Sequence, residues 1–112
     1  MGRRKKTREQ NEYDRLAVLY ADIPENKREL VDGLLWQAAR LKTMLDDLYA
    51  DIQANGEVEQ VTVKDDTRTV KRPQAELFTA RDKNYQAVMK QLNELLPEKK
   101  QKTGFTKMDD DD

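Results

Sequence analysis

A basic cluster near the N-terminus is the clearest chemical feature of the sequence. The first eight residues contain five cations and no acidic side chain. Closely spaced cations on a flexible arm neutralise several phosphates and release their counterions, so this arm is predicted to contact nucleic acid. No aromatic side chain is interleaved with the cations, which indicates affinity without sequence readout, although a terminus that only aids solubility is the alternative. The predicted DNA-binding residues are Arg3, Arg4, Lys5, Lys6 and Arg8.

Most of the residue types that enzymes use are missing. The chain has no cysteine and no histidine, which removes disulfides, thiolate nucleophiles, serine–histidine triads, and zinc sites built from Cys or His ligands. Its glycines are isolated, so no phosphate-binding loop is expected. The carboxylate pairs Asp46-Asp47 and Asp65-Asp66 have no metal-binding loop around them. The sequence therefore predicts a protein that is not an enzyme and that holds neither a metal nor a cofactor.

The composition predicts one small domain with a shallow core. Of the 112 residues, 37% are hydrophobic and 38% are charged, compared with about 45–50% apolar and about 25% charged in an ordinary globular domain. So few apolar residues favour an elongated or self-associating helical protein. No apolar stretch is long enough for a membrane span or a secretory signal, so we expect a cytoplasmic protein with no membrane partner.

The spacing of apolar residues predicts three helices. The first runs from about Glu9 to Ala21, the second from about Glu25 to Asn55, and the third from about Gln74 to Leu96. Apolar residues recur every three and four positions along the second helix, a pattern typical of helices that pack along their length. The members of this seam are Val31, Leu34, Ala38, Leu41, Leu45, Leu48 and Ile52.

Between the two long helices the pattern changes to β-branched residues. We expect a β-hairpin at about 57–72, with strands near 58–63 and 68–72. A two-stranded hairpin is marginal in water by itself, so it is expected to rest on a neighbouring element or a second protomer. The third helix has a matching seam interrupted by one charge, Arg81, for which Asp46 or Asp47 are the expected partners.

The second helix has more apolar residues than one seam requires. We predict that the surplus forms the interface of a homo-oligomer, while Trp36 has packing under the first helix as an alternative role. Gly33 lies inside this helix, where it costs about 1 kcal/mol relative to alanine. A close approach of another helix is the expected explanation, and a kink in the helix is the alternative. The predicted interface residues are Leu30, Leu35, Trp36, Met44 and Tyr49.

The expected organisation is a mainly α protein made of a long helical hairpin, a short N-terminal helix and a small β-hairpin between the two long helices. Residues 1–8 are the flexible basic arm, and residues 9–97 are a single helical oligomerisation domain. Residues 98–112 lose all periodicity and end in four aspartates, Asp109 to Asp112, which is typical of a disordered tail.

This order of elements resembles the short terminase small subunits of tailed phages and prophages of Gram-positive bacteria. The resemblance covers about Ala21 to Pro97 and rests on packing and turn signatures, with no catalytic residue among them. It implies a non-catalytic viral protein of the host cytoplasm that forms a homo-oligomeric ring, recognises double-stranded DNA and works with a terminase large subunit, an ATPase–nuclease. The residues before Pro24 are too few for the helix-turn-helix that many small terminases carry. The matching segments are Lys27–Leu35, Arg72-Pro73, Arg81–Tyr85 and Leu95–Pro97.

Two other functions remain open. A small DNA-binding regulator of the antitoxin type would leave a sequence-specific footprint on a defined operator. A coiled-coil adaptor that binds only protein would not bind DNA even at low salt.

Overall fold

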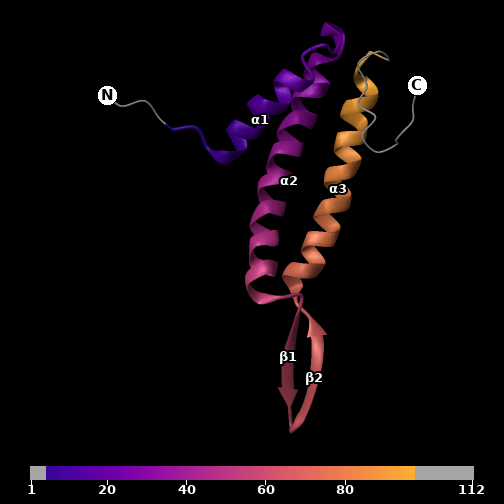
Figure 1. Ribbon diagram of the computed structural model, residues 1–112. Coiled ribbons are helices and arrows are strands. Elements are labelled where there is room, and N and C mark those ends of the chain that lie inside the picture. The colour runs from indigo at the N-terminus through magenta and orange to yellow at the C-terminus, as the bar shows by residue number, and fades with distance from the viewer. Residues whose placement is uncertain (1–4, 98–112) are drawn as a thin grey trace, which may run out of the picture.

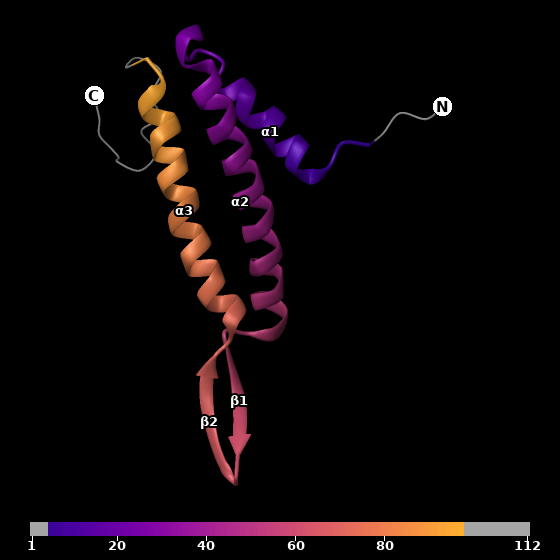
Figure 2. The same ribbon diagram turned by 180° about the vertical axis from the view of Figure 1, so that it is seen from behind.

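The computed structural model describes residues 5–97, and these form a helical hairpin with a short helix on its side and a β-hairpin at one end (Figure 1). Both views show α2 and α3 side by side, with the β-hairpin extending away from their far ends (Figures 1 and 2). The predicted mainly helical architecture is confirmed, whereas homo-oligomerisation stays a prediction. The elements are α1 (Arg8–Leu19), the 3₁₀ turn η1 (Glu25–Lys27), α2 (Arg28–Asn55), β1 (Val58–Val63), β2 (Asp66–Lys71) and α3 (Pro73–Leu95).

Helix α1 begins one residue before its predicted start because Thr7 caps it. The Thr7 hydroxyl accepts a hydrogen bond from the Gln10 backbone N–H at 3.1 Å, and the Gln10 side chain accepts one from the Thr7 N–H at 2.9 Å. This reciprocal capping box satisfies two N–H groups that a helix leaves without partners. Arg8, predicted as the last residue of the arm, is therefore the first residue of α1. Residues 1–4 and the predicted tail, 98–112, lie outside the described residues.

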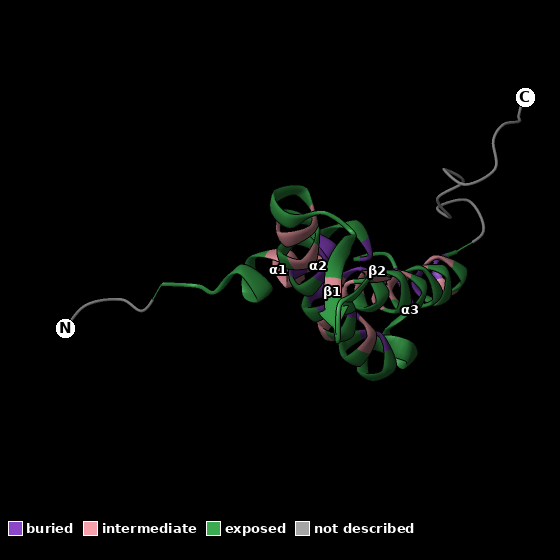
Figure 3. Ribbon diagram, turned by 90° about the horizontal axis from the view of Figure 1, so that it is seen from below, coloured by how far each residue is buried: buried purple, intermediate pink, exposed green. Residues whose placement is uncertain are grey.

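The core lies where α1, α2 and α3 meet. Every residue of the predicted α2 seam is buried or half-buried, which confirms the interpretation of its spacing. Figure 3 shows the buried residues between the helices and the exposed ones on the outer faces and on the β-hairpin. The cluster of buried side chains consists of Leu16, Tyr20, Ile23, Val31, Leu35, Ala38, Leu41, Val88, Leu92 and Leu96.

Helix α1 covers one face of α2 through an aromatic stack. The rings of Tyr13 and Trp36 lie 4.1 Å apart between centroids and 17° from parallel, and the Tyr13 hydroxyl donates a hydrogen bond to Asp32. Trp36 therefore packs under the first helix, which was one of its two predicted roles.

The β-hairpin closes in a two-residue turn. Lys64 and Asp65 both have positive φ, 51° and 67°, which matches the twist of antiparallel strands in a type I′ turn. Strand β2 therefore begins at Asp66, two residues before its predicted start. All residues of both strands are exposed or half-exposed. Within the described chain, the two strands pair only with each other, and the hairpin is joined to the helices at its base.

Arg72 fastens the base of the β-hairpin to the helices. Its guanidinium donates to Asp51 Oδ2 at 2.8 Å and to the Gly56 carbonyl at 2.6 Å, joining the end of α2 to the start of α3. The Arg72 backbone N–H also donates to the Glu57 carbonyl at 2.8 Å. We call these contacts the Arg72 clamp; the Arg72 side chain is only 12% exposed in it.

Candidate nucleic-acid and assembly surfaces

Two of the predicted DNA-binding cations are held by carboxylates of the same chain. Lys6 pairs with Asp14, and Arg8 Nη1 lies 2.9 Å from Asp47 Oδ1. All four side chains stay about half exposed or more, so a phosphate approaching these cations competes with weak, solvent-screened ion pairs. Arg3 and Arg4 lie outside the described residues. Lys5 makes no ion pair with another residue of the 5–97 range.

Arg8 also has a structural contact that sequence spacing did not reveal. Its Nη2 donates to the Thr43 carbonyl at 3.0 Å, so the same side chain binds both a backbone and a carboxylate group of α2. The hydrogen bond to Asp47 raises the pKa of Arg8 above its ordinary value. Arg8 therefore ties the N-terminal end of α1 to α2 in addition to carrying positive charge.

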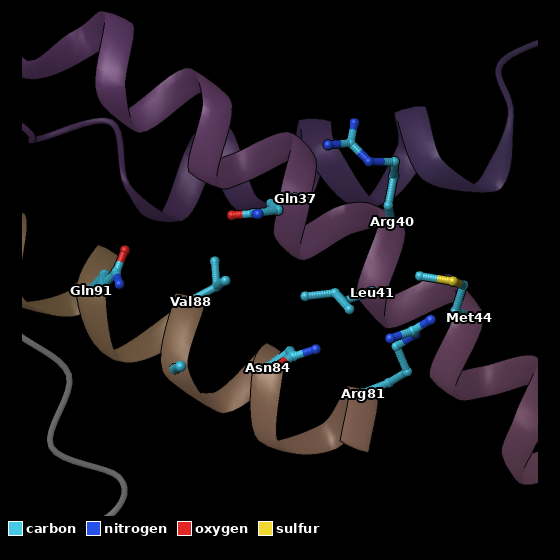
Figure 4. A pocket seen from close by; sticks show the side chains of 9 residues that line it. Gln37, Arg40, Leu41, Met44, Arg81, Asn84, Val88 and Gln91 are labelled. Carbon is cyan, nitrogen blue, oxygen red and sulfur yellow. The ribbon is translucent and has the colours of Figure 1, made fainter. Parts of the chain in front are cut away.

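A groove lies between α2 and α3, with a volume of about 510 Å³. Apolar side chains of both helices line it together with two arginines and three amides, and no acidic side chain is among them. Figure 4 shows Arg81 reaching from α3 toward Met44 of α2, whereas Arg40 projects away from α3. The lining residues are Gln37, Arg40, Leu41, Met44, Arg81, Asn84, Ala87, Val88 and Gln91.

The expected pairing of Arg81 with Asp46 or Asp47 is wrong. Asp46 accepts a hydrogen bond from Lys42 at 2.8 Å, and Asp47 binds Arg8. Both carboxylates lie beside α1, where Asp46 borders a second hollow formed with α1 residues. Arg81 instead faces the groove and makes no ion pair with another residue in the 5–97 range.

One stripe of α2 is exposed, and three of its members, Gln37, Arg40 and Met44, line this groove. Its five members are spaced three, four, three and four residues apart, so they share one side of the helix, and all are exposed. The spacing repeats that of the buried seam, although it includes a glycine and two polar residues. We call it the second stripe; it consists of Leu30, Gly33, Gln37, Arg40 and Met44.

The close helix approach expected at Gly33 is not found among residues 5–97. A methyl group built on Gly33 would meet no atom within 4 Å, apart from its own helical turn and chain neighbours. The glycine therefore leaves bare backbone on the second stripe, with room for a close approach by another helix.

The predicted interface residues divide into two groups. Leu30, Met44 and Tyr49 are exposed, and their role in an interface stays a prediction. Leu35 is buried in the core of the single chain, and Trp36 is half-buried beneath Tyr13. Part of the apolar surplus of α2 is therefore covered within the chain and is not free for an interface. The spacing of α2 alone could not show which of its residues α1 would contact.

The described residues contain no group of three or more side chains suited to hold a metal ion. None of their helices combines the length and apolar character that a membrane crossing requires. Comparison of the chain with protein-family models, with curated proteins and with solved structures finds no match.

Three tyrosines are expected to make the stability of the fold decrease at alkaline pH. The hydrogen bond to Asp32 raises the pKa of Tyr13, and burial raises the pKa of Tyr20 and Tyr85. In the unfolded chain these groups titrate near pH ~10. The folded state therefore keeps protons that the unfolded state releases, so stability is retained below this pH and falls as the pH rises above it. Melting temperatures measured from pH 8 to 11 should stay level at first and then decline. An unchanged melting temperature across that range would contradict the assignment.

Proposed function

We propose that the protein is a non-catalytic, homo-oligomeric small terminase subunit. In this role it binds double-stranded viral DNA and assists a separate large ATPase–nuclease subunit during genome packaging. The proposal joins the resemblance in the sequence to one structural observation, the uncovered second stripe of α2.

The second stripe supports assembly because it has the geometry of a helix-packing seam, yet it packs against no other helix of the described residues. Leu30 and Met44 are exposed apolar residues on it, and Gly33 would admit the backbone of another helix. Arg40 and Arg81 border the same groove without an acidic lining residue. A partner with an acidic or amide-bearing helix would satisfy these groups, and a second copy supplies such helices.

Assembly also gives DNA binding a physical basis. Within the basic arm, Lys6 and Arg8 already contact carboxylates, so a single arm binds phosphate weakly. Repeating the basic arm around an oligomer allows several weak phosphate contacts to act together, because each later contact forms at a high local concentration. The oligomer would therefore bind DNA more tightly than any single arm.

The first test of this proposal is the mass of the protein in solution. We expect an oligomer larger than a dimer at micromolar concentration, measured by light scattering against the 13.1 kDa mass of one chain. A monomer would overturn the proposed assembly and the ring implied by the resemblance. Gly33→Leu is a useful companion variant, because a Cβ at this position meets no described atom within 4 Å, while the larger side chain would obstruct a close approach by another helix and should weaken assembly.

The second test measures how DNA affinity depends on salt. Removing residues 1–6 deletes four predicted contacts, Arg3, Arg4, Lys5 and Lys6, while keeping the Thr7 cap and Arg8. Each lost phosphate contact reduces the slope of log affinity against log salt by about 0.9, so the slope should fall by about 3 to 4 per bound chain.

The matched control for this deletion removes charge elsewhere. Lys83→Gln with Lys90→Gln takes two exposed cations from α3 and should leave the slope nearly unchanged. If the deletion and the control have equal slopes, the arm is not the phosphate contact. Helicity measured by circular dichroism should remain the same in both variants, because neither deletes a residue of the core.

The pairing of Lys6 and Arg8 with carboxylates favours one alternative, an adaptor that binds only protein. Such an adaptor would assemble through the second stripe but would not bind DNA at low salt. A DNA-binding assay at low salt separates the two functions, because counterion release makes nonspecific binding strongest there.

A further inference from the structure

We propose that the β-hairpins of neighbouring copies join edge to edge, with β1 of one copy beside β2 of the next. This inference rests on the oligomer in the proposed function and names a second surface through which that oligomer is held. The partner is another copy of this chain, and the result is one antiparallel sheet that runs continuously from copy to copy.

The first support is that both outer edges of the hairpin lack partners within the described chain. The Arg72 N–H donates to the Glu57 carbonyl. In an antiparallel pair every second residue bonds to the partner strand, so from Glu57 onward the odd-numbered residues of β1 direct their N–H and C=O groups toward β2. The intervening residues of β1, which include Gln60, direct their N–H and C=O groups outward. By the strand register, Thr69 does the same on the other edge. Such edges are templates for pairing with another strand.

The second support is the unequal charge of the two strands. The β1 side carries Glu57 and Glu59 without a cation, whereas β2 carries Arg68 and Lys71 with one acid, Asp66. Asp66 and Arg68 are 3.6 Å apart in a well-exposed pair. Neither Glu59 nor Lys71 forms an ion pair with another residue of the described chain.

These charges select the order of strands between copies. Pairing β1 with β1, or β2 with β2, would place like charges side by side, which is unfavourable. By the strand register, Glu59 lies on the same face of the hairpin as Arg68, whereas Lys71 lies on the opposite face. Pairing β1 with β2 therefore places Glu59 of one copy diagonally across from Arg68 of the next. The hairpin edges therefore favour a head-to-tail arrangement, in which each copy uses two different surfaces.

The third support is geometric. Turning one copy about an axis parallel to its hairpin places β2 beside β1 of the next copy, in antiparallel direction and at the same height. The hairpin extends beyond the helices, so they do not block either edge (Figures 1 and 2). The strand register also gathers Val61, Val63 and Val70 on one face of the hairpin. Closing the ring would leave no free edge and would bring these valines from successive copies together.

Cysteine cross-linking tests this arrangement directly, because the natural chain contains no cysteine. Gln60→Cys and Thr69→Cys place thiols on opposite edges at the same height of the hairpin. Neighbouring strands lie about 5 Å apart, within the Cα separation that a disulfide spans. When the two single-cysteine variants are mixed and oxidised, we expect disulfide-linked pairs that contain one chain of each kind.

Each variant alone is the matched control and should give few disulfide-linked dimers. Predominant dimers within one variant would mean that like edges meet, and the proposed order would be wrong. An intact oligomer that yields no disulfide in any mixture would also overturn the inference, yet it would leave the proposed function standing. A monomeric wild-type protein would overturn both this inference and the proposed function.

Charge exchange provides an independent measurement. Glu59→Lys alone and Arg68→Glu alone should each weaken association about fivefold at low salt, the effect expected of an exposed pair. A chain that carries both exchanges again has edges of opposite charge and should recover the wild-type association. If the two single losses of association simply add in the double variant, the two substitutions act independently, and pairing between these edges is contradicted.

Discussion

Replacing Leu16 by alanine is expected to lower the free energy of unfolding by about 3 kcal/mol. Leu16 is 0% exposed and belongs to the cluster that joins α1 to the helical hairpin. Removing its branched end loses buried apolar contact and leaves a cavity that the surrounding helices cannot fill without moving. Urea denaturation of the wild-type protein and of Leu16→Ala, at equal protomer concentration, measures the difference in the free energy of unfolding.

Val18→Ala is the control, because Val18 lies on the same helix and is 76% exposed. This change should alter the free energy of unfolding by less than about 0.5 kcal/mol, as is usual at the surface. Equal effects at the two positions would mean that α1 does not pack against α2 in solution. A larger effect at Val18 on association than on unfolding would indicate that its exposed side chain contacts another copy.

Replacing Arg72 by alanine is expected to lower the free energy of unfolding by about 2 kcal/mol. The substitution removes three interactions at once: the ion pair with Asp51, the hydrogen bond to the Gly56 carbonyl, and the packing of a side chain that is 12% exposed. It also leaves the Asp51 carboxylate, which is 30% exposed, without its cation. The measurement is chemical denaturation, together with the strand signal in circular dichroism.

Two further variants separate the Arg72 clamp from a general effect of charge. Arg68→Ala removes an arginine whose ion pair is exposed, and it should cost less than about 0.5 kcal/mol. Arg72→Lys keeps the charge but cannot bind the carboxylate and the carbonyl with a planar fork, so an intermediate loss is expected. If Arg72→Ala has no greater effect than Arg68→Ala, the clamp does not stabilise the fold.

Most of the helical architecture could be predicted from the sequence, because the spacing of apolar residues within one segment is enough to indicate a helix and its buried side. The seam from Val31 to Ile52 specifies one side of α2, and Gly56 and Pro73 mark where helices end and begin. The β-branched segment between them predicted the hairpin. Its turn was harder to place because Lys64 and Asp65 adopt positive φ without a glycine or asparagine to signal it.

The surfaces were less predictable because they depend on how elements cross. Arg8 and Asp47 are 39 residues apart in the sequence, and nothing in either segment indicates that α1 runs back along α2. At that crossing Arg8 binds Asp47, Leu35 is buried in the core, and Trp36 is half-buried beneath Tyr13. The second stripe shares its three-and-four spacing with the seam, yet its glycine and polar residues disguise it in a count of apolar positions.

The Arg72 clamp has a consequence for the order in which the chain folds. The β-hairpin pairs residues that are near neighbours in sequence, and such hairpins close in about 1–10 μs. Once Glu57 and Arg72 meet, the chain between α2 and α3 no longer behaves as a long flexible loop, so most of the entropy needed to bring the helices together has already been lost. The hairpin should therefore form before the helices dock, and substitutions that weaken its turn should slow folding more than they speed unfolding.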